Sequence, residues 1–267
     1  NPPAQPAPAR PAATIVLMRD ADHNLEILLL KRVQSSGFVP GAWVFPGGGV
    51  DAGDASPAVL ERVRGLRLKD AEARMDLEDA KTPAMAYYLA ALREAFEETG
   101  ILVARSDGNE RIPAAHADPR ILAARARLLH GQCLFTDILE EFDAFLDLRG
   151  VEYIAHWITP LVEPRRYDTR FFAAAVDEYV VPSIHEEEIA RAIWIAPREA
   201  LKRSEAGSLP MVFPTLKTLE ALAGLDSTTA VLEEFQSRTI PSILPRLIRT
   251  RNGVILRTSE VISEHER

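Results

Sequence analysis

The chain has 267 residues, of which 47% are hydrophobic, and a formal net charge of −8 at pH 7. This length and composition suffice for one large domain with additions, and the acidic balance argues against a nucleic-acid or anionic-membrane partner. The single cysteine, Cys133, excludes an internal disulfide and a cysteine-based metal cluster. No apolar run reaches the roughly 20 residues of a membrane span, so we expect a cytoplasmic protein.

The N-terminal part predicts a flexible tail followed by a β-hairpin. Residues 1–12 are rich in proline and poor in bulky side chains, so we expect them not to pack. Two strand-like runs, 13–18 and 25–30, flank a polar turn and predict a hairpin. Lys31 and Arg32 end its second strand.

The middle of the chain predicts mainly helices. Residues 56–81 have a helical pattern with many charges, and a clearer helix is expected from Pro83 to Thr99, ended by Gly100. One face of this helix is apolar and predicts core packing: Met85, Tyr88, Leu89, Leu92 and Phe96. Residues 105–118 indicate a loop, and 120–130 and 136–148 indicate two more helices.

The last third alternates strand and helix signals. Residues 152–158, 170–176 and 193–195 are expected to be strands, and helices are expected from Pro197, over 211–222 and over 229–236. Asn252-Gly253 between apolar runs predicts a hairpin. Because no repeat or linker is evident, we expect one domain over residues 13–267, with insertions at about 55–82 and 105–150 and a C-terminal extension from about 211.

The helix at 83–99 carries three acids at positions i, i+3 and i+4, which place them on one face: Glu94, Glu97 and Glu98. Like charges this close repel unless water solvates them or a counter-ion neutralises them. A solvated acidic face and a cation site are therefore the two alternatives. Mg²⁺ favours carboxylate oxygens and leaves positions free for water and phosphate, so it is the expected cation, with Mn²⁺ as a substitute.

Two segments resemble the halves of the Nudix box. Arg93-Glu94-Ala95-Phe96-Glu97-Glu98-Thr99-Gly100-Ile101 is similar to its second half, and Phe45-Pro46-Gly47-Gly48-Gly49-Val50-Asp51-Ala52-Gly53-Asp54 is similar to its first half. Asp54 stands where the family usually has glutamate. Between Asp54 and Arg93 lie 38 residues where the box has seven, which indicates an insertion of about 31 residues.

The resemblance implies an α/β fold, an α/β/α sandwich with a mixed sheet, and metal-dependent cleavage of a nucleoside diphosphate linked to another moiety. It implies metal ligands at Glu94, Glu97, Glu98 and the Gly48 carbonyl, with Arg93 orienting the acids. Nudix proteins commonly supply one more acid from a loop before a late strand, and Glu188 is the first choice here, ahead of Glu187. Glu188 is the expected general base or a further ligand, with Glu94 as the rival base; a solvated charge run is the alternative.

Basic residues are expected to hold the substrate. Arg32 is a candidate phosphate contact, because a Nudix sheet usually delivers a basic residue there. Arg165, Arg166 and Arg170 are a cationic cluster beside Tyr167, whose ring could stack on a base; structural ion pairing is the alternative.

The interrupted box resembles one Nudix branch, which includes a peroxisomal coenzyme A diphosphatase, and this makes coenzyme A or acyl-coenzyme A the leading substrate. A second coenzyme A branch carries a pre-box motif that Val33 and Gly37 do not match. ADP-ribose or a nucleotide sugar, or a non-catalytic nucleotide-binding module, remain alternatives, and a homodimer stays open.

Overall fold

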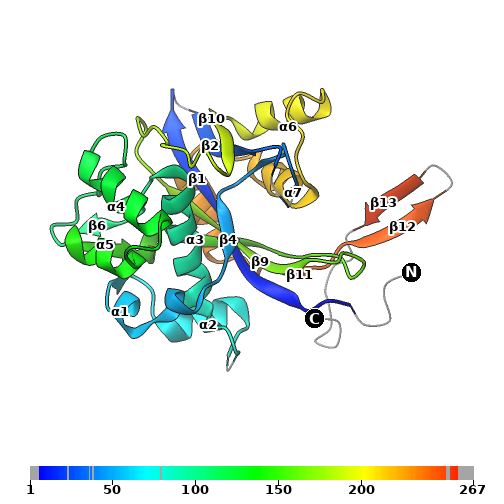
Figure 1. The fold of residues 1–267 in the computed structure, drawn as a ribbon. Helices are drawn as coiled ribbons and strands as arrows, with labels where there is room; N and C mark the ends of the chain where they lie inside the picture. The colour runs from blue at the N-terminus through cyan, green and yellow to red at the C-terminus, as the bar shows by residue number, and fades with distance from the viewer. Residues whose placement is uncertain are drawn as a thin grey trace.

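Eight strands form one mixed sheet in the computed structural model of the chain (Figure 1). The structure describes residues 6–22, 24–35, 37, 39–78, 80–250 and 253–257, with side chains described up to residue 246. The strand order is β10-β2-β1-β9-β8-β11, with β3 paired to β2 and β4 paired to β1. The bounds are β1 Ala9–Ala21, β2 Asn24–Arg32, β3 Trp43–Val44, β4 Gly47–Gly49, β8 Val151–Ile158, β9 Arg166–Ala175, β10 Ile189–Ile195 and β11 Ser242–Ile243.

The central strand β1 begins inside the predicted tail. Its residues Ala9–Ala12 pair in parallel with Arg166–Thr169 of β9, so the prediction of a tail over residues 1–12 is wrong for residues 9–12. Proline fits an extended strand because its fixed φ is compatible with one, and it lacks only the donor. The carbonyl of Pro11 still accepts a hydrogen bond from the Val50 amide at 3.1 Å.

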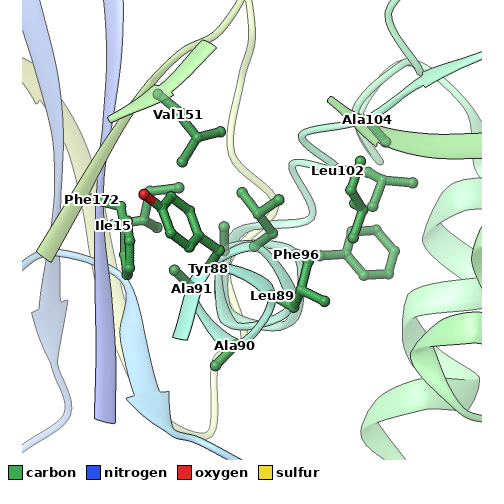
Figure 2. Packing of buried hydrophobic residues seen from close by; sticks show 14 of the residues in the cluster. Ile15, Tyr88, Leu89, Ala90, Ala91, Phe96, Leu102, Ala104, Val151 and Phe172 are labelled. Atoms are coloured by element: carbon green, nitrogen blue, oxygen red, sulfur yellow. The ribbon is translucent and has the colours of Figure 1, made fainter. Parts of the chain in front are cut away.

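Helices cover both faces of the sheet, which confirms the predicted α/β/α sandwich. Alternate residues of β1 point to opposite faces: Ile15 and Leu17 join the core under α3 (Ala84–Thr99), and Val16 and Met18 join the core under the C-terminal helices. In the first core the ring of Tyr88 lies against Phe172 with centroids 4.4 Å apart (Figure 2).

Helix α3 matches the predicted helix within one residue and is buried almost all round. Its N-cap is Pro83, so the helix begins one residue after the predicted start, and Gly100 ends it with a left-handed φ of 69°. The helix is covered by the sheet on one side and by the inserted elements on the other. Its acidic C-terminal half is therefore held in a protein environment and is not a free surface.

The two insertions pack together into one addition on the α3 side. After η1 Ala52–Ala55, they contain α1 Pro57–Leu60, β5 Val63–Arg64, α2 Leu68–Met75, β6 Arg105–Ser106, α4 Pro119–Leu129, α5 Phe135–Glu141, β7 Ala144–Asp147 and η2 Leu148–Gly150. A three-stranded sheet of order β5-β7-β6 takes one strand from the first insertion and two from the second.

The helical pattern expected over 56–81 is interrupted at Gly65, whose φ is 86°. The helix expected over 136–148 is wrong after Glu141: the chain turns at Asp143, with φ 44°, and β7 follows with alternating burial. The period-2 pattern there outweighs the helical spacing.

The three helices expected in the last third are present as α6 Pro197–Glu205, α7 Phe213–Leu222 and α8 Thr228–Gln236, and they cover the second face of the sheet. Strands β12 Arg246–Thr250 and β13 Gly253–Arg257 form the expected antiparallel hairpin, which extends from the body of the molecule in Figure 1. Asn252 of its predicted turn lies outside the described residues. None of the helices in the described ranges is both long and apolar enough to cross a bilayer.

Candidate active site

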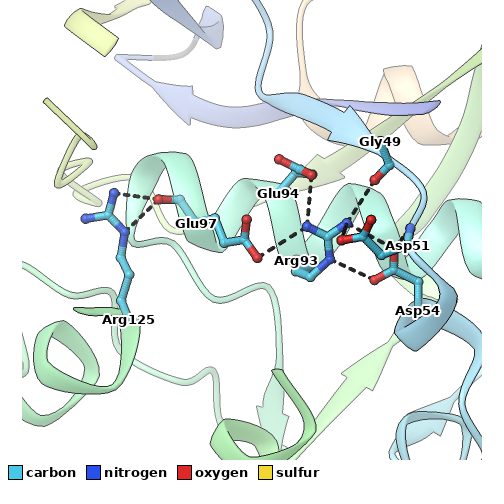
Figure 3. Close-up of polar contacts among 7 residues, drawn as sticks. All are labelled: Gly49, Asp51, Asp54, Arg93, Glu94, Glu97 and Arg125. Carbon is cyan, nitrogen blue, oxygen red and sulfur yellow. Dashed lines mark hydrogen bonds and ion pairs between the residues drawn. The ribbon is translucent and has the colours of Figure 1, made fainter. Parts of the chain in front are cut away.

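The fold reunites the two halves of the interrupted motif. Asp54 and Arg93 are 39 positions apart in sequence, yet Arg93 Nε donates to Asp54 Oδ1 at 2.8 Å and Nη2 donates to Oδ2 at 3.0 Å (Figure 3). Asp54 also accepts from the Asp51 amide at 2.8 Å. Both members of the pair are buried, and a bidentate pair of this kind fixes the guanidinium plane. Asp54 therefore reaches Arg93 although its side chain is one methylene shorter than that of glutamate.

Arg93 in turn holds two of the predicted metal-binding acids. Its Nη1 donates to Glu94 Oε1 at 2.8 Å and to Glu97 Oε1 at 3.2 Å, and its Nη2 donates to the Gly49 carbonyl at 2.9 Å (Figure 3). Since one rigid guanidinium contacts both carboxylates, it restricts their rotamers. This geometry agrees with the predicted orienting role of Arg93.

The glycine turn lies directly against the acids. The Gly47 amide donates to Glu98 Oε2 at 3.1 Å, and a Cβ on Gly48 would lie only 2.4 Å from Glu94 Oε1. A side chain at Gly48 would therefore collide with the carboxylate. At Gly47 a Cβ would lie 2.4 Å from the Ala13 carbonyl oxygen, a backbone atom, so glycine is needed there.

Burial raises the pKa values of these acids. The pKa of Glu98 rises to about 8, chiefly by burial and then by the charge of Glu94, against the opposing effect of the Gly47 amide. The pKa of Glu94 rises to about 7, chiefly by burial and against the Arg93 charge, and burial also raises the pKa of Glu97. The protein groups alone therefore do not compensate the negative charge of this cluster.

The loop that carries Glu188 is bonded to the end of α3. The Ser183 amide donates to the Thr99 carbonyl at 2.7 Å, and the His185 amide donates to the Glu98 carbonyl at 3.1 Å. Glu188 itself is exposed just before β10, and its carbonyl accepts from the Val33 amide at 2.9 Å.

Arg32 and Glu188 both lie within electrostatic reach of Glu98, since the charge of Arg32 lowers and the charge of Glu188 raises its pKa. The structure thus brings both of these predicted site residues to the acidic face.

Arg125 is a residue that the sequence interpretation missed. It lies on α4, is buried, and donates through Nε at 2.9 Å and Nη2 at 2.6 Å to the backbone carbonyl of Glu97 (Figure 3). Burial lowers its pKa to about 10. The available signal was an arginine on the buried stripe of a helix, in register with Ile121 and Ala124. The second insertion therefore contacts the acidic end of α3 and is not remote from it.

The three arginines of the predicted cationic cluster have different surroundings. Arg165 is exposed and donates to the Gly37 carbonyl. Arg166 is buried and donates to the carbonyls of Thr159 at 3.0 Å and Ala7 at 2.7 Å. These backbone contacts favour the structural alternative for Arg166, whose side chain holds the start of β9.

Arg170 is likewise buried, at 1% exposure. It donates to Asp168 at 3.1 Å, and its guanidinium lies 4.2 Å from the centre of the Tyr87 ring. Arg166 and Arg170 are buried because β9 starts at Arg166, in a segment that was predicted to be a loop before a strand over 170–176. Tyr167 is half-buried, and by strand alternation it faces away from Arg166.

The acids suit a hard divalent cation by their chemistry, although they are not converged on one point. Among the described residues, no group of three His, Cys, Asp or Glu side chains is arranged as a metal site. The reason is visible in the contacts: Glu94 and Glu97 turn to Arg93, and Glu98 turns to the Gly47 amide. All the donors are oxygens, the ligand atoms that Mg²⁺ prefers, so the set fits Mg²⁺ by its chemistry.

An α/β/α sandwich with a glycine turn against an Arg-Glu-x-x-Glu-Glu helix defines a Nudix hydrolase. The NUDT19 Nudix domain matches residues 4–222, so the chain belongs to this family of Nudix hydrolases.

The relatives of this chain include proteins named acyl-coenzyme A diphosphatase NUDT19. The chain is 28% identical to the one from Gallus gallus over 76% of this chain and 62% of that protein. It is 25% identical to the one from Homo sapiens over 96% of this chain and 73% of that protein. The chain thus spans less than two thirds of the length of the Gallus gallus relative. A solved structure, a NUDIX hydrolase from Alicyclobacillus acidocaldarius, superposes with a TM-score of 0.71 at 29% identity, covering 85% of this chain and 96% of that chain.

Proposed function

We propose that this protein hydrolyses the diphosphate bond of coenzyme A or acyl-coenzyme A in a reaction that depends on a divalent cation. The observation that carries the proposal is the acidic face of α3, which is oriented by the buried Arg93–Asp54 pair and lies against the Gly47–Gly48 turn. The relatives named acyl-coenzyme A diphosphatase support the choice of substrate.

Glu94, Glu97 and Glu98, with the Gly48 carbonyl, would hold the cation, and Mg²⁺ is the expected one. When bound, it would neutralise the diphosphate and lower the pKa of a bound water. Glu188 is proposed as a further ligand or as the general base. Its carbonyl accepts a hydrogen bond from the Val33 amide just after β2, and the amide of His185, three residues earlier, donates to the Glu98 carbonyl. Both bonds fix the loop beside the acids.

The remaining roles are assigned to arginine side chains. Arg93 holds Glu94 and Glu97 in defined rotamers, so we propose it as a positioning residue. Arg32 is proposed to contact a substrate phosphate, since its charge already reaches Glu98. Arg165, just before β9, is exposed, so we propose that it contacts a substrate phosphate. Tyr167 is proposed to lie next to the nucleotide.

A substrate panel tests the proposal. Coenzyme A, an acyl-coenzyme A, ADP-ribose, a dinucleotide and a nucleotide sugar would each be incubated with Mg²⁺ and the products separated by chromatography. We expect 3′,5′-ADP and a phosphopantetheine from the coenzyme A compounds, with the highest kcat/KM of the panel. Faster cleavage of ADP-ribose or a nucleotide sugar would reassign the substrate, and no cleavage of any compound would contradict the proposed hydrolysis.

A further inference from the structure

A small pocket lies on the face of the sheet opposite α3. It has a volume of about 210 Å³, and its lining includes Lys31 of β2, Trp43 of β3, Arg191 of β10, and Arg203, Ser208 and Leu209 at the end of α6. In β2, Leu29 belongs to the core under the C-terminal helices and Leu30 belongs to the core under α3. Strand alternation therefore places Lys31 on the side away from the acidic cluster, so the pocket is distinct from the candidate active site.

The pocket concentrates positive charge in an acidic protein. Lys31 and Arg191 are direct partners in the β10–β2 register, and like charges opposite one another destabilise a strand pair. In the part of the chain that the structure describes, neither side chain forms an ion pair or a side-chain hydrogen bond. Arg203 is neutralised in part, because its Nε donates to Glu199 Oε1 at 2.7 Å. The chain as a whole has a net charge of −8, so this local excess is unlike the rest of it.

The size of the pocket limits what could compensate this charge. A volume of about 210 Å³ is smaller than the roughly 300–1,000 Å³ of pockets that hold a drug-sized ligand. Trp43, which is 4% exposed, lines the pocket and offers no open ring face for a nucleotide base. A compact anion therefore fits better than a whole nucleotide.

We propose that this pocket binds a small doubly charged oxyanion of the size of inorganic phosphate. Lys31 and Arg191 would each give it a charge-assisted hydrogen bond, and the anion would remove their mutual repulsion. The proposal is independent of the reaction at α3, because the two sites lie on opposite faces of the sheet.

Calorimetric titration of inorganic phosphate tests the proposal in the full-length protein. The titration is done at constant ionic strength with EDTA present, so that no divalent cation can recruit phosphate to the acidic face. The double variant Lys31→Met with Arg191→Gln should lose at least about tenfold in phosphate affinity, since a charge-assisted hydrogen bond contributes more than the 1.4 kcal/mol of a tenfold change.

The matched control is the double variant Lys69→Met with Lys81→Met, which removes two exposed lysines of the first insertion, outside the pocket. It should bind phosphate within about twofold of the wild type, since distant exposed charges are screened. Phosphate should also raise the melting temperature of the wild type and of this control, but not that of the pocket variant. Equal affinity in the wild type and the pocket variant, or no binding by the wild type at about 10 mM phosphate, would overturn the proposal.

Discussion

The burial of Glu98 predicts a stability that depends on pH in the metal-free protein. Burial raises the pKa of Glu98 from 4.5 to about 8, so the folded protein retains a proton that the unfolded chain loses in this window. The free energy of unfolding should therefore fall as pH rises from about 5 to about 8, by on the order of 1 kcal/mol per pH unit for this group. Glu94, whose pKa rises to about 7, should add to the fall.

The variant Glu98→Gln removes the larger of these two contributions. A neutral amide pays no penalty for ionisation and can still accept a hydrogen bond from the Gly47 amide. With EDTA present, Glu98→Gln should match the wild type at pH 5 and exceed its unfolding free energy by a few kcal/mol at pH 8. Urea denaturation at the two pH values measures the difference. Adding Mg²⁺ at pH 8 should stabilise the wild type more than the variant.

The exposed Glu186 supplies the control for this experiment. Glu186→Gln removes one acid from the loop before β10 without removing a buried charge. It should follow the wild-type curve at both pH values. Parallel pH curves for the wild type and Glu98→Gln would refute the assignment of the buried charge to Glu98.

Three further predictions follow from the site contacts. Asp54→Ala should lower the free energy of unfolding by about 3 kcal/mol and reduce turnover, because it leaves a buried guanidinium without its bidentate partner. Glu188→Ala should reduce kcat more than Glu186→Ala, and its pH–rate profile should lose its acidic limb if Glu188 is the base. Arg165→Ala should raise KM with little change in kcat, whereas Arg166→Ala should lower the melting temperature, because its side chain bonds backbone carbonyls.

For each of these predictions, one experimental outcome would contradict it. Asp51 lies 3.6 Å from Arg93 but is 75% exposed, so Asp51→Ala should cost little, and an equal loss in Asp51→Ala and Asp54→Ala would contradict the buried-pair argument. Equal, small rate effects at positions 186 and 188 would move the base elsewhere, first to Glu94. An unchanged KM in Arg165→Ala would show that Arg165 does not contact substrate.

Local signals predicted the parts of the site that depend on neighbouring residues. Short segments determine the helical spacing of Glu94, Glu97 and Glu98 and the helix end at Gly100. They also determine where the chain enters β10 after Glu188, and the structure agrees with all three. The pairing of Asp54 with Arg93 was left in question, because it depends on where a long insertion returns the chain.

Long-range pairing explains what the sequence did not predict. Arg166 and Arg170 are buried because β9 starts early and pairs with β1 residues such as Ala9, which themselves lie in a proline-rich segment. Arg125 reaches the Glu97 carbonyl only because α4 packs on α3; its position beside Ile121 and Ala124 indicates burial but does not indicate its partner. The sequence alone does not distinguish a buried arginine, such as Arg166, from an exposed one, such as Arg165.

The central claim is that the acids of α3 hold the divalent cation needed for diphosphate hydrolysis. Its most direct test is the rate of coenzyme A cleavage as Mg²⁺ is titrated into the EDTA-treated wild type and Glu97→Gln. We predict no cleavage without metal, a saturating rise in the wild type, and a loss of at least about a hundredfold in the variant with its circular dichroism unchanged. Cleavage in the presence of EDTA, or near wild-type turnover in Glu97→Gln, would contradict the claim.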